Sequence, residues 1–327
     1  MNNNKSVGVI GSGSWGTAIA QLISRNNYKV LLWGRDNSVI DDINKNHVNS
    51  KYFKGIKLSK NIKATVSLKE VAENSEVIFM VIPSVAFRII SQKLGNYLNG
   101  SHIIISATKG IEDNSFSPMS NIIEEETPVK KIGALSGPNL SKEIMMKHPS
   151  ATVVASDFEC VINKIKTILN HKLFNVYGSN DIIGVELSGA YKNIVAITSG
   201  ISTGKNYGVN TFSYLITEGM IEMRKLGLAM GSKEETVSSL AGIGDLIATC
   251  TSPLSRNFRF GKALGEGKSL EDAKKEINQT IEGIFAVKSI NHFAKIHNVK
   301  LPLLSTMHNI IYKGKEIDES IEKLLQV

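Results

Sequence analysis

The first half of the chain alternates short apolar runs with helical or loop material. Ser6–Ile10 predicts a buried strand, and a glycine-rich turn and a helical pattern over 17–25 follow it directly. Further apolar runs predict strands over 28–33, 76–82, 102–107, 131–135, 151–155 and 174–177. Because helical or loop material separates these runs, we expect crossover connections and a mostly parallel sheet.

From residue 181 onward the alternating strand patterns give way to long helical patterns. They cover 181–201, 212–226, 234–240, 281–296 and 304–312, with Pro302 between the last two. We therefore expect an α/β protein with two domains, a sheet domain over 1–180 and an all-helical domain over 181–327. The length of 327 residues suits two domains of ordinary size.

Three glycines, Gly11, Gly13 and Gly16, form a G-x-G-x-x-G pattern between the first strand and its helix. The first permits a tight turn, the second lets a pyrophosphate approach the backbone, and the third lets helix and strand pack closely. The helix N-terminus then offers N–H groups to phosphates. A glycine-rich turn without a ligand is the alternative, but the strand–turn–helix context favours a dinucleotide in a Rossmann-type domain of 1–180.

The end of the second strand bears on the choice of dinucleotide. An acidic residue about 20 positions after the glycines usually binds the ribose of NAD, but Arg35 precedes Asp36 here. A guanidinium suits the 2′-phosphate of NADP. NADP is therefore favoured, with NAD also open, and the alternative for Arg35 is an ordinary surface arginine.

Composition narrows the class of protein. Hydrophobic residues make up 42% and charged residues 21%, as in an ordinary globular protein, and no run is long enough for a membrane span. Two cysteines without paired spacing suit a reducing compartment and offer no metal site. Residues 1–5 lead into a glycine-interrupted strand rather than a signal peptide. We expect a cytoplasmic protein without a membrane partner.

The net charge of +8 is spread over lysines that lie among acidic residues, as in Lys274-Lys275-Glu276. Nucleic acid, an anionic membrane surface and small anions would each suit such a charge. The absence of a dense basic block favours a solvated surface and phosphate-bearing small ligands over nucleic acid.

Three segments place polar residues among apolar or small ones: 106–110, 186–193 and 242–249. Lys109 follows the carboxyl end of a strand, where open α/β sheets bind ligands. Lys192 lies in a predicted helix, with Ser188 on the same face. Taken singly, each lysine is more often a solvated surface charge.

Together these segments resemble the bacterial-type NAD(P)-dependent sn-glycerol-3-phosphate dehydrogenase family over essentially the whole chain. The matching motifs are Gly-Ser-Gly-Ser-Trp-Gly at 11–16, Thr-Lys-Gly at 108–110, Leu-Ser-Gly-Pro-Asn at 135–139, Ala-Tyr-Lys-Asn at 190–193, Gly-Ile-Gly-Asp-Leu at 242–246, Ser-Arg-Asn at 255–257 and Glu-Gly at 282–283. The resemblance implies an oxidoreductase that interconverts sn-glycerol 3-phosphate and dihydroxyacetone phosphate and supplies phospholipid synthesis.

The resemblance also implies roles for single residues. Lys192 matches the proton acceptor, and the substrate contacts match Lys109, Gly137, Asn139, Lys192, Asp245, Ser255, Arg256 and Asn257. The cofactor contacts match Gly11, Gly13, Ser14, Trp15, Gly16, Arg35, Lys109, Ser141, Arg256, Thr280 and Glu282. Ser141 stands where alanine is usual and Thr280 where valine is usual, which weakens those two assignments. No metal is implied.

The residue types suit the chemistry. Oxidising a secondary alcohol requires a base for the hydroxyl proton, and the reverse reaction requires an acid at the same place. A lysine serves both if burial or a like charge lowers its pKa; we expect Lys109 to supply the like charge and Asp245 to orient Lys192 or the substrate. Ser255, Arg256 and Asn257 would bind phosphate in a loop that leads into a helix, although a plain helix cap with an exposed arginine is the simpler alternative.

Two other functions stay open from the sequence. A sister reductase for ketopantoate, a sugar acid or a hydroxy acid would share the architecture. A non-catalytic dinucleotide sensor or RNA-binding protein is the rival from another class. The helical domain could also supply the face of a homodimer, although no residue pattern establishes one.

Overall fold

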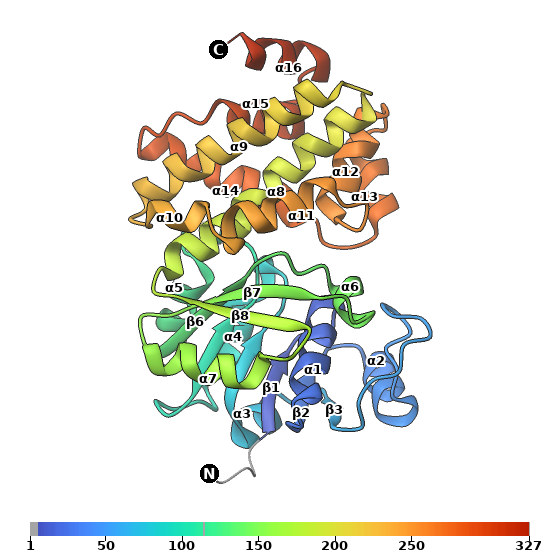
Figure 1. The fold of residues 1–327 in the computed structure, drawn as a ribbon, viewed down its shortest axis with the longest axis vertical. Coiled ribbons are helices and arrows are strands. Elements are labelled where there is room, and N and C mark those ends of the chain that lie inside the picture. The colour runs from blue at the N-terminus through green and yellow to red at the C-terminus, as the bar shows by residue number, and fades with distance from the viewer. Residues whose placement is uncertain (1–5, 114, 327) are drawn as a thin grey trace. The chain divides into compact units, whose positions relative to one another are not determined.

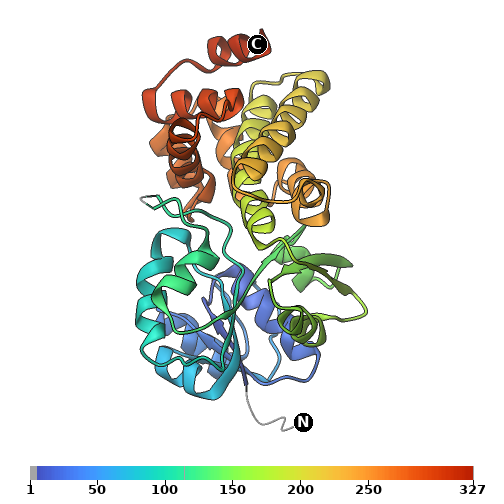
Figure 2. The ribbon, with the colours of Figure 1, turned by 90° about the vertical axis from the view of Figure 1, so that its left-hand side faces the viewer.

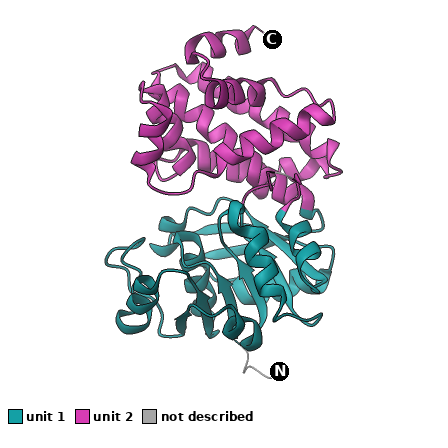
Figure 3. Cartoon of the chain, turned by 180° about the vertical axis from the view of Figure 1, so that it is seen from behind, with its two compact units in different colours: residues 1–108, 119–182 teal, residues 109–118, 183–327 magenta. Residues whose placement is uncertain are grey.

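The computed structural model describes residues 6–113 and 115–326, so residues 1–5, which bear on the signal-peptide prediction, lie outside it. The chain forms two compact units (Figure 3). One comprises the described residues up to Thr108 and Met119–Ile182, and the other comprises Lys109–Pro118 and the residues from Ile183 onward. The expected division of labour, with a dinucleotide on 1–180 and substrate chemistry on 181–327, stays a prediction.

The first unit contains one eight-stranded sheet in the order β3-β2-β1-β4-β5-β6-β7-β8. The strands are β1 Ser6–Ile10, β2 Val30–Trp33, β3 Ile62–Thr65, β4 Ser75–Met80, β5 Ile103–Ser106, β6 Lys131–Ser136, β7 Ser150–Ala155 and β8 Phe174–Ser179. All neighbours are parallel except β6 and β7. The predicted α/β class with a mostly parallel Rossmann-type sheet is confirmed.

The pattern missed one strand, β3. It has only four residues, lies at the edge of the sheet and exposes Lys63 between buried neighbours. A run that short carries too little apolar signal to be separated from a loop. Only its parallel pairing with β2, a contact between segments about 30 residues apart, identifies it as a strand.

Helices cover both faces of the sheet (Figures 1 and 2). Successive strand residues point to opposite faces, so Val77 and Phe79 join one apolar core and Ile78 and Met80 join the other. The helices and turns of this unit are α1 Ser14–Arg25, α2 Asn37–Asp41, η1 Asp42–Asn46, α3 Leu68–Asn74, η2 Ser84–Ala86, α4 Phe87–Gly95, α5 Met119–Glu126, α6 Ser141–Met145 and α7 Glu159–Leu169. The first core takes residues from α1 and α7 and the second from α3, α4 and α5.

Among the described residues from Ile183 onward, the second unit forms helices and no strand, as the pattern from residue 181 onward predicts. They are α8 Ile182–Gly204, α9 Val209–Ala229, α10 Glu234–Val237, η3 Leu240–Gly244, α11 Asp245–Thr251, α12 Arg256–Gly265, α13 Leu270–Ile277, α14 Glu282–Ile296, α15 Pro302–Lys313 and α16 Ile317–Leu325. Pro302 opens α15, where its missing N–H breaks no helical bond. None of the helices described here is both long and apolar enough to cross a membrane.

A short excursion from the sheet belongs to the helical unit. After β5, residues 109–118 leave the strand and pack with the helices before the chain returns at α5. Ile111 is buried in the helical core, and Phe116 stacks on His292 with ring centroids 4.7 Å apart. Lys109 is therefore held by the same unit as Lys192, which a division of the chain at residue 180 does not anticipate.

Glycines allow α8 and α12 to approach closely. A Cβ at Gly200 would lie 2.1 Å from the carbonyl oxygen of Phe258, and one at Gly261 would lie 1.9 Å from that of Ile197. Real Cβ atoms do not tolerate such distances, so the two backbones touch only because side chains are missing here. This contact sets the start of α12, where Ser255 lies, relative to Lys192 on α8.

A buried carboxylate joins three helices in this unit. Glu222 on α9 is 0% exposed and accepts hydrogen bonds from the hydroxyl of Tyr191 on α8 and from the N–H groups of Leu303 (2.6 Å) and Leu304 (3.1 Å). Burial raises the pKa of Glu222 to about 7, and the three donated bonds limit the rise. The carboxyl group thus satisfies donors in the first turn of α15 that have no intrahelical acceptor.

This pKa makes the stability depend on pH. The folded-state pKa of Glu222, about 7, lies above the ordinary 4.5. Its stabilising contribution to the free energy of unfolding is therefore fully present below pH 4.5 and is lost as the pH rises through 7. Between these pH values the unfolding free energy of the wild type should fall by up to about 3 kcal/mol because of Glu222. Glu222→Gln has no group that titrates at this position, so this fall should be absent from the variant. Denaturant unfolding at a series of pH values measures it, with exposed Glu235→Gln as the control; parallel pH profiles for wild type and Glu222→Gln would contradict it.

Candidate active site

The glycine turn lies between β1 and α1, as expected. Gly11 has φ +124°, a conformation that side chains rarely adopt, and a Cβ on Gly16 would lie 1.8 Å from the carbonyl oxygen of Gly11. A Cβ on Gly13 would meet nothing within 4 Å. The turn is therefore closed at its first and third glycines and open at its second, the arrangement that an approaching pyrophosphate requires. Ser14 and Trp15 begin α1 behind it.

Arg35 and Asp36 have separate environments at the end of β2. Asp36 caps α2 through the N–H of Ser38 (3.1 Å) and pairs with Lys51 (2.9 Å). The hydroxyl of Ser38 and then Lys51 lower the pKa of Asp36 to about 2. Arg35 is exposed and lines a surface pocket of about 480 Å³ whose other lining residues include Trp33, Ser67, Lys69, Lys93, Asn96 and Tyr97.

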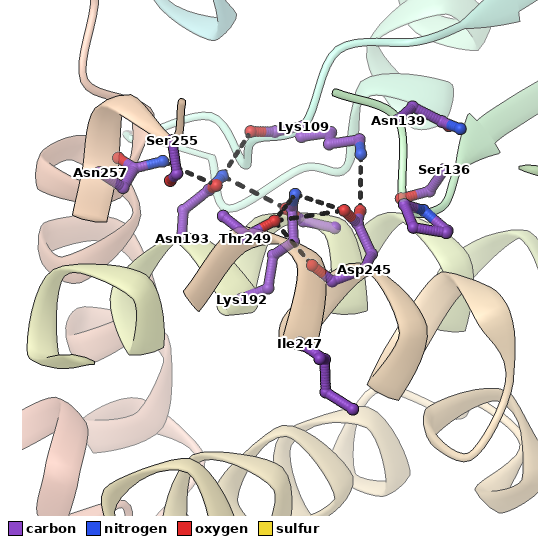
Figure 4. Close-up of polar contacts among 12 residues, drawn as sticks. Lys109, Ser136, Asn139, Lys192, Asn193, Asp245, Ile247, Thr249, Ser255 and Asn257 are labelled. Atoms are coloured by element: carbon purple, nitrogen blue, oxygen red, sulfur yellow. Dashed lines mark hydrogen bonds and ion pairs between the residues drawn. The ribbon is translucent and has the colours of Figure 1, made fainter. Parts of the chain in front are cut away.

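One buried carboxylate holds two lysines in the helical unit (Figure 4). The Nζ of Lys192 lies 2.6 Å from Oδ1 of Asp245, and the Nζ of Lys109 lies 2.6 Å from Oδ2. Asp245 is 2% exposed and Lys192 is 5% exposed, whereas the side chain of Lys109 keeps 17%. Each carboxylate oxygen thus serves one ammonium group, and both lysines are drawn to a single point.

Thr249 completes this cluster, and the sequence argument did not single it out. Its hydroxyl donates to the carbonyl oxygen of Asp245 one turn earlier on α11 and accepts from Nζ of Lys192, both at 2.6 Å. Asp245 and Thr249 are four positions apart and share a helix face. That spacing was the available signal, because Thr249 ends one of the three polar segments in the sequence.

Burial and charge act in opposite directions on the three ionisable groups. The pKa of Lys109 falls to about 8: burial is the largest influence and lowers it, Asp245 raises it in part, and the charge of Lys192 adds to the lowering. Burial alone would raise the pKa of Asp245, but the two lysines outweigh it and leave the pKa below its usual value. The cluster therefore keeps a carboxylate and makes Lys109 a weaker base than an ordinary lysine.

A chain of side-chain amides runs beside the lysines. Asn257 Nδ2 donates to Oδ1 of Asn193 (2.8 Å), and Oδ1 of Asn257 accepts from the N–H of Gly283 (3.0 Å). Asn193 Nδ2 in turn donates to the carbonyl oxygens of Gly189 (3.3 Å) and Lys109 (3.5 Å). The chain connects α8, α12, α14 and the excursion that carries Lys109. Asn193 is a second residue to which sequence reasoning gave no role, although it lies in the Ala-Tyr-Lys-Asn motif beside Lys192.

The segment 255–257 begins α12. Ser255 is the N-cap, and its hydroxyl accepts from the N–H of Phe258 at 3.2 Å. The simpler sequence alternative of a helix cap is thus correct for the hydroxyl of Ser255, and Asn257 uses its amide within the protein. Arg256 is half-buried beside them. A ligand at this site would meet the guanidinium and the positive end of the helix.

Gly137, Asn139 and Ser141 lie in the sheet unit after β6. Gly137 has φ +151°, and its Cβ would come within 3.0 Å of Cα of Thr152. The side chain of Asn139 donates to the carbonyl oxygen of Ala151 (2.9 Å) and accepts from the hydroxyl of Thr152 (2.8 Å). Ser141 begins α6. The amide of Asn139 thus fastens this turn to the antiparallel strand β7.

Two family models cover most of the chain. The model for the N-terminus of NAD-dependent glycerol-3-phosphate dehydrogenase matches residues 6–161, and the model for its C-terminus matches 181–322. The chain belongs to the NAD-dependent glycerol-3-phosphate dehydrogenase family. The family resemblance expected from the motifs is confirmed.

Individual relatives agree with this family. Glycerol-3-phosphate dehydrogenase (NAD(P)+) from Acinetobacter baylyi is 43% identical over 308 residues, 94% of this chain and 86% of the relative. The enzyme of that name from Macrococcus caseolyticus is 37% identical over 322 residues, 98% and 97% of the two chains. A crystal structure of glycerol-3-phosphate dehydrogenase from Coxiella burnetii has a TM-score of 0.96 at 34% identity, over 99% and 100% of the two chains.

A ketopantoate reductase from Ralstonia eutropha shares only the fold. Its TM-score is 0.59 at 12% identity, over 98% of this chain and 99% of the other. The sister reductases considered from the sequence are therefore similar in architecture, and family membership separates this chain from them.

The candidate residues fall into both compact units. The helical unit holds Lys109, Lys192, Asp245, Ser255, Arg256, Asn257, Thr280 and Glu282, and the sheet unit holds Gly11, Gly13, Ser14, Trp15, Gly16, Arg35, Gly137, Asn139 and Ser141. Within the helical unit the structure brings Lys109, Lys192 and Asp245 together. Over residues 6–113 and 115–326, no three His, Cys, Asp or Glu side chains are grouped to hold a metal ion.

Asp245→Asn tests the shared carboxylate. It leaves two ammonium groups without their counter-charge, so we expect the unfolding free energy at pH 7 to fall by about 3 kcal/mol. Lys109 has a folded-state pKa of about 8, below the ordinary 10.5, and the variant lowers it further. The folded variant then loses this proton at a lower pH than the folded wild type, so the deficit should shrink as the pH rises toward about 8, where Lys109 of the wild type loses its proton as well.

Denaturant unfolding of wild type and variant across this pH range measures the effect. Glu319→Gln, which removes the exposed partner of Lys323, is the matched control and should leave stability unchanged. A deficit that stays constant with pH would show that the lysines are not its source.

Proposed function

We propose that this chain interconverts sn-glycerol 3-phosphate and dihydroxyacetone phosphate with NAD(P), with Lys192 as the group that takes and returns the hydroxyl proton. The observation that carries the assignment is the buried cluster of Lys192, Asp245 and Thr249 in a member of the glycerol-3-phosphate dehydrogenase family. When bound, the coenzyme accepts hydride from the alcohol carbon or delivers it to the ketone carbon. We also assign its product, sn-glycerol 3-phosphate, to phospholipid synthesis, on the family resemblance alone.

The contacts of Lys192 suit a proton carrier. Asp245 and Thr249 each accept a hydrogen bond from its Nζ. The third N–H of the ammonium group is then left for a substrate oxygen. In the oxidative direction the neutral amine removes the hydroxyl proton, and in the reductive direction the ammonium donates it to the carbonyl oxygen. Asp245 stabilises the ammonium that forms, and Lys109 adds positive charge beside the developing oxyanion.

The substrate phosphate would be bound by groups that favour an anion. Arg256 and the N-terminus of α12 supply a guanidinium and backbone donors, and Ser255 and Asn257 hold that terminus in place. We assign Gly137 and Asn139 to the substrate as well, and Ser141, Thr280 and Glu282 to the coenzyme, on the family resemblance alone. The substrate is a small phosphorylated molecule, and a homodimer is part of the proposal.

The open glycine turn supports a coenzyme site on the sheet unit. The turn has room at Gly13, and helix α1 begins there. The coenzyme pyrophosphate would therefore be held by Gly11, Gly13, Ser14, Trp15 and Gly16. Arg35 favours NADP over NAD, since Asp36 is engaged with Ser38 and Lys51 rather than free for a ribose. Lys69 and Lys93, which line the same pocket as Arg35, add to its attraction for a phosphate.

The cysteines bear on the compartment. Both Cys160 and Cys250 are free thiols, and Cys250 is buried, so the described part of the chain depends on no disulfide. This supports the proposal that the protein works in a reducing compartment, the cytoplasm.

Lys192→Ala tests the proton carrier. Loss of general acid–base catalysis should lower kcat by about a hundredfold to ten-thousandfold, because the proton loses its positioned acceptor. The dissociation constant for NADPH should stay within about twofold of wild type. The assay follows NADPH oxidation by dihydroxyacetone phosphate, with Lys262→Ala, an exposed lysine on α12, as the control. Undiminished turnover in Lys192→Ala would remove the residue from this role.

Arg35→Ser tests the choice of coenzyme. Loss of a charged, forked donor to the 2′-phosphate should lower kcat/KM for NADPH about tenfold to a hundredfold and leave that for NADH little changed. Initial rates with each coenzyme at saturating dihydroxyacetone phosphate measure the ratio. Lys45→Ser removes an exposed cation that pairs with Asp41 and does not line this pocket, so it should change neither rate. An equal loss with both coenzymes would contradict a contact to the 2′-phosphate.

A further inference from the structure

A buried asparagine from a distant loop contacts the glycine turn. Asn49 lies 37 residues beyond Ser12, yet its Nδ2 donates to the carbonyl oxygen of Ser12 at 3.1 Å and to the hydroxyl of Thr17 at 2.9 Å. The hydroxyl of Thr17 reaches the same Ser12 carbonyl at 3.4 Å. Asn49 is 0% exposed. Two side chains therefore converge on one backbone oxygen inside the turn.

We propose that Asn49 is a positioning residue for the coenzyme, because it sets the orientation of the peptide between Ser12 and Gly13. This inference rests on the proposed dinucleotide site. A trans peptide is planar, so its C=O and N–H point in opposite directions. Hydrogen bonds that hold the Ser12 carbonyl toward Asn49 and Thr17 consequently direct the Gly13 N–H away from them.

The surroundings of Gly13 leave room for a ligand to accept a hydrogen bond from its N–H. Gly13 is the N-cap of α1, and it is the glycine of the motif over which a Cβ would meet no atom within 4 Å. Its N–H belongs to the set of donors that a helix N-terminus offers to a phosphate. By fixing the peptide in advance, Asn49 spares the bound state the entropy loss of ordering it.

The orientation of the Asn49 amide supports this role. Its Oδ1 is buried without a hydrogen-bond partner, although a buried polar atom normally has one. Turning the amide around would place Oδ1 against the Ser12 carbonyl, acceptor against acceptor. The side chain therefore leaves its oxygen unsatisfied in order to donate to the turn.

The loop around Asn49 does not need this side chain to stay in place. The carbonyl oxygen of Asn49 accepts from the N–H groups of Tyr52 (3.1 Å) and Phe53 (2.8 Å), and the N–H of Leu58 donates to the carbonyl oxygen of His47 (2.8 Å). The N–H of Ser50 donates to Asp42 (2.9 Å). Since none of these bonds uses the side chain of Asn49, truncating it should leave the loop intact and release only the turn.

Equilibrium binding of NADPH, NADH and ADP-ribose tests the inference. Asn49→Ala removes the donor, and Asn49→Leu removes it while keeping a side chain of similar size, which protects the fold. We expect both variants to bind all three ligands about tenfold more weakly, because each ligand carries the pyrophosphate. At saturating NADPH, kcat and the KM for dihydroxyacetone phosphate should match wild type, a separation that a general loss of structure would not produce.

Asn44→Ala is the matched control. Asn44 belongs to the same segment and makes two hydrogen bonds to Ala64, at 2.8 and 2.9 Å, without touching the glycine turn. Its loss should lower thermal stability and leave the three dissociation constants unchanged. The inference would be overturned if wild type and both Asn49 variants bound the ligands equally, or if Asn44→Ala weakened binding as much as the Asn49 variants do. Neither result would contradict the proposed function. A wild-type protein that binds none of the three ligands would overturn the proposed function with it.

Discussion

The helical unit is organised around one carboxylate that two lysines share. Asp245 is almost completely buried, and burying such a charge is unfavourable unless it is paired. Lys192 from α8 and Lys109 from the excursion after β5 supply that pairing. Without the carboxylate, each buried ammonium group would face the other's charge with no opposite charge beside it, which is unfavourable. The requirement for mutual neutralisation therefore brings three distant parts of the chain to one point.

Close backbone packing makes that meeting possible. Gly200 and Gly261 let α8 and α12 touch, and a Cβ at Gly283 would lie 2.8 Å from the carbonyl oxygen of Asn193. The amides of Asn193 and Asn257 then occupy the space between the helices and satisfy backbone groups there. Small residues along these helices are thus part of the site, since they determine how near its polar side chains can come.

In the sheet unit, backbone conformation rather than charge determines the geometry of the candidate coenzyme site. The turn at Gly11 needs a positive φ, Gly16 needs room for a neighbouring carbonyl, and Gly13 stays open. Outside the motif, Asn49 and Thr17 hold the carbonyl of Ser12. The glycine turn is in this sense a contact between a local motif and a remote loop, and only the motif is visible in the sequence.

The sequence by itself determined the α/β class, seven of the strands, the helical second half and the glycine turn, because periodicity and glycine spacing are local signals. Its motifs also identified the family. It did not reveal β3, Thr249, Asn193 or Asn49, nor that residues 109–118 pack with the helices. A short edge strand and a single buried amide have no period, and their partners lie far along the chain. Tertiary packing decided these features, since hydrogen bonds and ion pairs depend on which distant groups become neighbours after folding.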